Sequence, residues 1–154
     1  MKACKMLLFA IALCLTCAVG STAHAQDYGQ QHPAYMHALS DLRLMRAYLD
    51  RLTPSEHVDA EQQNAIGEID AAIREIKEAA IDDHRDLRDH APIDANITPA
   101  SRFRKAREAG DAAWHDLDRE EDNGFARGLK HRALGHIEKA NHIVDHIMRR
   151  FDRM

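Results

Sequence analysis

His142 and His146 are the residues whose types and spacing most directly suggest chemistry in this chain. Four residues apart on a helix, two imidazoles project from one face in successive turns. Glu138 lies four residues before His142 on the same face, and Asp145 lies beside it. Imidazole and carboxylate groups are ligands for Cu(II), Ni(II) and Zn(II). Ordinary exposed histidines on an acidic helix give the same pattern, so a metal site here is one of two interpretations.

Two more histidines of the same segment are weaker candidates. His131 shares the outer face with His142, but the eleven-residue separation places them roughly 16 Å apart along a helix, too far to ligate one ion. His136 is expected at the edge of the core face. The candidate metal ligands are therefore His142, His146, Glu138, His131 and His136.

The first 25 residues have the order of a secretory signal peptide. Lys2 and Lys5 precede an apolar run from Met6 to Val19, and Ala23-His24-Ala25 fits a cleavage site. The run is shorter than the roughly 18–20 residues that a membrane-spanning helix needs. We therefore expect a periplasmic or secreted protein, cut after Ala25, with no stable membrane anchor afterwards.

Cleavage would change the composition in ways that bound the function. It would leave 129 residues, remove all three cysteines, and so exclude disulfides, thiolate metal sites and c-type haem. The net charge would fall from −4 to −6, and no basic stripe for nucleic acid remains. Ten histidines stay, and protonating all of them would bring the charge to +4. Because histidines titrate around pH 6.5, we expect the charge to change sign in mild acid.

Enzyme motifs do not occur in the mature sequence. It has no Glu-x-x-His pair of a di-iron bundle, no H-E-x-x-H, no glycine-rich phosphate loop and no G-x-S-x-G. The acidic run 116–122 lacks the glycine of an EF-hand and has Leu129 where the closing glutamate belongs. We therefore expect no catalytic residues and no enzymatic turnover.

Apolar residues recur at helical spacing in four blocks, which predicts an all-α protein. The blocks run from Tyr35 to Leu52, Ile66 to Ala80, Phe103 to Leu117 and Leu129 to Phe151. Four amphipathic helices with mostly short joins predict an antiparallel up-down-up-down four-helix bundle over residues 33–154, after a flexible arm over residues 26–32.

Local signals place the helix boundaries. Pro33 suits a first helical turn, and so does Pro99 behind the N-cap Thr98. The second helix has two possible starts, a capping box at residues 53–56 and a rival one turn later at residues 59–62. Residues 90–98 are expected to form a loop, and Asn123-Gly124 to end the third helix.

One apolar pair falls outside the core stripe of the first helix. Leu44 and Tyr48 are expected on its opposite side. An exposed patch there would provide a contact for a homodimer. Two exposed apolar residues are also ordinary in a monomer.

Most of the mature chain resembles a group of small, exported, helical bacterial proteins of mostly unknown function. The similar stretches are HPAYMHALSDLR (32–43), AIREIKEAAIDDHRDLRDHAP (72–92) and EEDNGFARGLKHRALGHIEKA (120–140). The segment KHRALGHIEKANHIVDH (130–146) also loosely resembles the small metal-binding protein family, whose members are periplasmic, histidine-rich helical bundles. That resemblance implies metal binding.

Two functions follow as expectations. The first is a periplasmic buffer or carrier that binds Cu(II), Zn(II) or Ni(II) through surface histidines. The alternative is a metal-independent envelope stress or interaction protein that responds to pH through its histidines and acts on a client that the sequence does not identify.

Overall fold

The computed structural model describes residues 33–50, 59–79, 86–94, 96–119 and 124–153. These residues form four helices: α2 (Pro33–Asp50), α3 (Ala60–Ala79), α4 (Pro99–Arg119) and α5 (Gly124–Phe151). No strand occurs among them. The all-α fold class and the four helices predicted from apolar periodicity are confirmed.

The helix starts follow from local sequence chemistry. At the start of α3, the backbone N–H of Gln62 donates to Asp59 Oδ1 at 2.8 Å, and the N–H of Asp59 donates to Gln62 Oε1 at 3.1 Å. This reciprocal pair is a capping box. The later of the two predicted starts is therefore the observed one. At α4, the N–H of Ser101 donates to Thr98 Oγ1 at 3.2 Å, as expected for an N-cap.

Removing the Asp59 cap should cost stability in a pH-dependent way. We expect Asp59→Ala to lower the free energy of unfolding by about 1 kcal/mol at neutral pH. Burial raises the pKa of Asp59, but the bonds from Gln62 and Arg150 outweigh it and hold the pKa below 3.8. A carboxyl whose pKa is lowered by folding stabilises the folded state at pH values above its unfolded-state pKa. This stabilisation is lost as the pH falls through the folded-state pKa.

Urea unfolding at about pH 7 and about pH 3 measures this difference. Asp59→Asn is the control, because its side-chain oxygen still caps the helix. It should lose less than Asp59→Ala at neutral pH. An Asp59→Ala deficit that is the same at both pH values would contradict the expectation.

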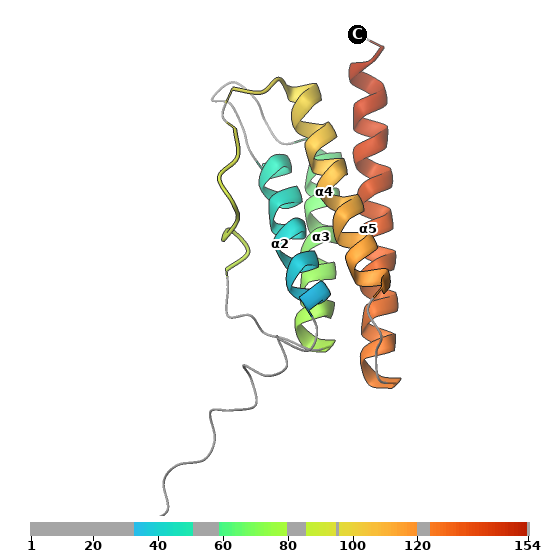
Figure 1. Ribbon diagram of the computed structural model, residues 1–154. Helices are drawn as coiled ribbons and strands as arrows, with labels where there is room; N and C mark the ends of the chain where they lie inside the picture. The colour runs from blue at the N-terminus through green and yellow to red at the C-terminus, as the bar shows by residue number, and fades with distance from the viewer. Residues whose placement is uncertain (1–32, 51–58, 80–85, 95, 120–123, 154) are drawn as a thin grey trace, which may run out of the picture.

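The packing order of the helices differs from their order in sequence. α3 packs on α5 and α2 on α4, and the ring closes through α4 with α5 and α2 with α3. Figure 1 shows α2 and α5 running in one direction and α3 and α4 in the other. The expected up-down-up-down order is thus replaced by up-down-down-up. The long connection between α3 and α4 permits this, because it is long enough to return along a helix of about 30 Å.

The core is built from the predicted apolar stripes. The fully buried side chains include one face from each helix: Leu39, Leu42 and Leu49; Ile69, Ile73 and Ile76; Phe103 and Leu117; Ile137, Val144 and Ile147. The connection between α3 and α4 adds Leu87, Ile93 and Ile97, which are partly buried against the same core.

Two residues depart from the predicted faces. Tyr48, expected on an exposed patch, is only 8% exposed, and Leu44 is partly buried against the core. α2 is buried around most of its circumference, so the apolar patch that suggested a homodimer is not exposed. Phe151, expected in the core stripe of α5, is 38% exposed because it is the last residue of the helix. Its ring lies 5.3 Å from that of Phe103.

Several expectations lie outside the described residues. They are the signal peptide, the N-terminal arm, the capping box at residues 53–56, and Asn123 of the predicted end of the third helix. Gly124, the other residue of that predicted helix end, is instead the first residue of α5. In the part of the chain that is described, no helix is both long and apolar enough to cross a membrane.

Candidate functional site

All five candidate ligands lie on α5, and the apolar positions of this helix recur at helical spacing. Ala133, Ile137, Ala140, Val144 and Ile147 are fully buried, which turns the intervening positions outward. His131, His142 and His146 are exposed, and His136 is half-buried at the edge of the core. The faces inferred from the 100° helical period are therefore those of the structure.

His146 meets a carboxylate of the neighbouring helix. Its Nδ1 lies 2.9 Å from Glu61 Oε1, in the first turn of α3. Glu61 also faces Arg150, whose Nη2 lies 2.9 Å from Glu61 Oε2 and 2.7 Å from Asp59 Oδ2. An imidazole, a carboxylate and a guanidinium thus meet at the seam between α3 and α5.

His136 makes a second contact of the same kind further along the seam. Its Nδ1 lies 2.5 Å from Glu68 Oε2, and both side chains are about a quarter exposed. At the far end of the seam, Arg132 pairs with Glu75 at 2.9 Å. Each of these three α5 side chains therefore has a carboxylate partner on α3.

Glu61, Glu68 and Glu75 are absent from the predicted set of metal ligands. They repeat every seven positions, so they form one stripe along α3. That heptad spacing is the signal that could have found them. Their pairing with α5 could not be found in the same way, because the sequence does not show which helix packs beside α3.

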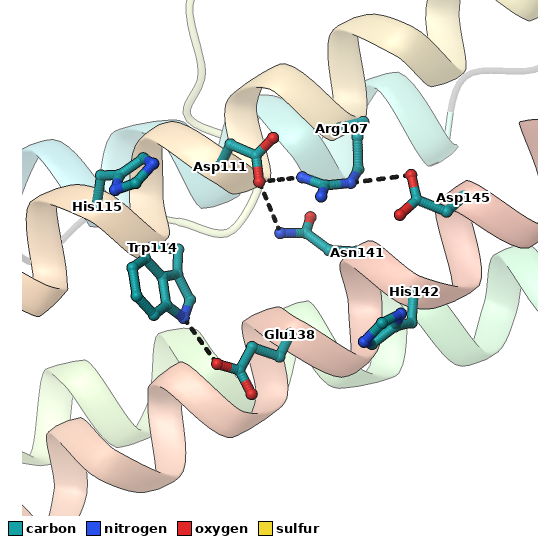
Figure 2. Close-up of a pocket in the computed structure, with 8 residues that line it drawn as sticks. All are labelled: Arg107, Asp111, Trp114, His115, Glu138, Asn141, His142 and Asp145. Atoms are coloured by element: carbon teal, nitrogen blue, oxygen red, sulfur yellow. Dashed lines mark hydrogen bonds and ion pairs between the residues drawn. The ribbon is translucent and has the colours of Figure 1, made fainter.

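His142, which is exposed on α5, lines a shallow groove between α5 and α4 (Figure 2). The groove has a volume of about 280 Å³. Glu138, the expected carboxylate partner of His142, instead accepts a hydrogen bond from Trp114 Nε1 at 3.1 Å. The groove is lined by Arg107, Asp111, Trp114, His115, Glu138, Asn141, His142 and Asp145.

Arg107 occupies the polar end of this groove. Its guanidinium pairs with Asp111 on its own helix and with Asp145 on α5, the latter at 3.0 Å. Burial lowers the pKa of Arg107, but the hydrogen bonds and charges of the two carboxylates raise it by more. The pKa of Arg107 is therefore above its usual value. Two of the three carboxylates in the groove thus share one guanidinium.

The floor of the groove is a close approach between α4 and α5. Asn141 is 7% exposed, and its Nδ2 donates to Asp111 Oδ1 at 3.4 Å. A Cβ at Gly110 would collide with Asn141 Oδ1 and would lie 2.9 Å from Met45 Sδ. The two helices can approach this closely only because position 110 has no side chain.

The structure therefore brings the predicted ligands together only in part. His146 and His136 each contact a carboxylate of α3, whereas Glu138 is directed to Trp114, and His131 lies three helical turns from His142. Among the described residues, no three His, Cys, Asp or Glu side chains converge as a group that could hold a metal ion in this conformation.

Comparison with known proteins gives no relative from which a role could be transferred. No family model matches the chain, and no curated protein or solved structure matches it significantly.

Proposed function

We propose that the chain is an exported helical bundle, antiparallel between packed neighbours, that binds divalent transition-metal ions through surface histidines. The order of Lys2, the apolar run and Ala23-His24-Ala25 supports export and cleavage after Ala25. Export would place the protein in the periplasm or outside the cell. Removing every cysteine with the signal peptide would leave imidazole and carboxylate as the strongest available ligands.

The observation that carries the proposal is the contact between His146 and Glu61. A nitrogen and an oxygen donor from two helices lie 2.9 Å apart on an accessible seam. His142 is exposed one helical turn earlier, with its Cβ about 5–6 Å from that of His146. Rotation of its exposed side chain would complete a donor set of two imidazoles and one carboxylate.

This donor set differs from the expected one in its carboxylate. Glu61 replaces Glu138, which is held by Trp114 on the α4 side. His136 with Glu68 forms a second nitrogen–oxygen pair, and His131 stands apart. Two imidazoles and a carboxylate suit Cu(II), Zn(II) or Ni(II), with water in the remaining positions. Such an open surface site exchanges ions readily, which is appropriate for a buffer or carrier without turnover.

Calorimetric titration with Zn(II) and Cu(II) tests the proposal. We expect His142→Ala/His146→Ala to weaken binding at least tenfold, because two of the three donors disappear, and losing even an outer-sphere partner of a metal ligand costs about 10–100-fold. His131→Ala is the matched control, because it removes an exposed histidine from the same helix about 16 Å away. It should leave the affinity at His142 and His146 unchanged.

Two results would overturn the metal proposal. One is no binding by the untagged mature protein, and the other is equal affinity in the double variant and the wild type. The metal-independent alternative is favoured by the contact between His136 and Glu68, which ties α3 to α5 through a titratable group. It predicts a change of oligomeric state between about pH 7.5 and 5.5 with chelator present, or protection of an unfolding client.

A further inference from the structure

Glu61 is shared between two partners, one on each carboxylate oxygen. His146 Nδ1 faces Oε1, and Arg150 Nη2 faces Oε2, both at 2.9 Å. His146 and Arg150 are four residues apart on α5, so both reach α3 from the same face. A metal ion bound by His146 and Glu61 would therefore lie beside a guanidinium.

The two contacts of Arg150 are unequal. Its Nη2 donates a hydrogen bond to Asp59 Oδ2 at 2.7 Å. Its contact with Glu61 is an ion pair without hydrogen-bond geometry, and the buried Oε2 atom accepts no hydrogen bond. Arg150 is thus hydrogen-bonded to Asp59, whereas its contact with Glu61 is an ion pair. The carboxylate can turn toward another cation while Arg150 keeps its hydrogen bond.

Arg150 is also a permanent cation. The hydrogen bond to Asp59 raises its pKa, as do the charges of Glu61 and Asp59, against a smaller lowering by burial. An arginine remains charged at any physiological pH, so its competition for Glu61 cannot be relieved by deprotonation. The competition must be relieved by a cation that binds Glu61 more strongly.

We propose that Arg150 is a built-in competitor that occupies Glu61 when no metal is bound and thereby weakens the affinity of the His142/His146/Glu61 site. This inference rests on the proposed metal-binding function. It assigns Arg150 a positioning role, because the residue sets the availability of Glu61 and does not contact the ion. The ion pair between Arg150 and Glu61 must be broken before Glu61 can bind the metal.

Titration of the mature protein with Zn(II) alone, at low ionic strength, tests the competitor. Arg150→Gln should raise the Zn(II) affinity about two- to fivefold, the range expected from breaking one exposed ion pair. Arg149→Gln is the matched control, because it removes the same charge at the adjacent exposed position. It should give less than half of that gain. Thermal unfolding of each variant verifies that the bundle remains folded.

The decisive comparison is made in a Glu61→Gln background. In that background position 61 has no carboxylate for Arg150 to pair with. Adding Arg150→Gln should therefore give no further gain in Zn(II) affinity. If removing any positive charge raised the Zn(II) affinity, Arg150→Gln would still give a gain in the Glu61→Gln background. Arg149→Gln would then also give the same gain as Arg150→Gln. Either result overturns the competitor. If neither the wild type nor Arg150→Gln binds Zn(II), the metal-binding function fails, and the competitor fails with it. If the wild type binds and Arg150→Gln is unchanged, only the competitor fails.

Discussion

Replacing Gly110 by alanine is expected to destabilise the bundle by about 1–3 kcal/mol, the usual cost of inserting a methyl group into a filled space. The added Cβ would collide with Asn141 Oδ1 and would meet Met45 Sδ at 2.9 Å. Asn141 is buried and tied to Asp111, so it cannot move without losing that bond. The close approach of α4 and α5 would have to widen instead.

The direction of this stability change is informative, because helix propensity alone predicts that Gly110→Ala stabilises the protein. Alanine is favoured over glycine in a helix interior by about 1 kcal/mol. Gly67→Ala on α3 is the matched control, because a Cβ added there would meet no atom within 4 Å and the helix is exposed at this position. That variant should gain about 0.5–1 kcal/mol. Urea unfolding of both variants makes the comparison, and a stabilising Gly110→Ala would show that the contact is not tight.

Breaking the ion pair between α2 and α3 is the second change with a large expected effect. Arg46 Nε donates to Asp70 Oδ1 at 2.9 Å, with the two side chains 16% and 21% exposed. Burial lowers the pKa of Arg46, but the hydrogen bonds and charges of Asp70 and Asp50 raise it more. Arg46→Met would leave the Asp70 carboxylate partly buried without its cation. We expect a loss of about 1–3 kcal/mol.

A double replacement distinguishes the orphaned charge from lost packing. Arg46→Met/Asp70→Ala removes both charges and should recover part of the stability lost by Arg46→Met alone. Arg132→Met, which breaks the more exposed pair with Glu75, should cost much less. Chemical denaturation at fixed pH measures all three variants. A double variant less stable than both single variants would show that packing of the Arg46 stem dominates.

The sequence predicted the features that depend on neighbouring residues. The stripe from Ile66 to Ile76 and the Thr98 cap follow from helical periodicity and from hydrogen bonding within one turn. The outward direction of His142 follows in the same way. The heptad of glutamates on α3 was visible in the sequence as well, but its function depends on which helix lies opposite.

The features that depend on distant residues could not be predicted. The burial of Tyr48 reflects how completely α2 is enclosed, and the contact between His146 and Glu61 reflects the packing of α3 on α5. Both depend on the path of the connection between α3 and α4. Composition indicates that this connection is a loop, but it does not determine beside which helix α4 packs or in which direction α4 runs.

That path also has a consequence for how the chain folds. Helix pairs adjacent in sequence, α2 with α3 and α4 with α5, can form early by short-range closure. The pairs α2 with α4 and α3 with α5 require the longer connection to close first. Contacts between distant segments slow folding relative to a bundle of purely sequential neighbours. The region where Glu61 meets His146 joins two such segments, so it should be complete only when the two hairpins have docked.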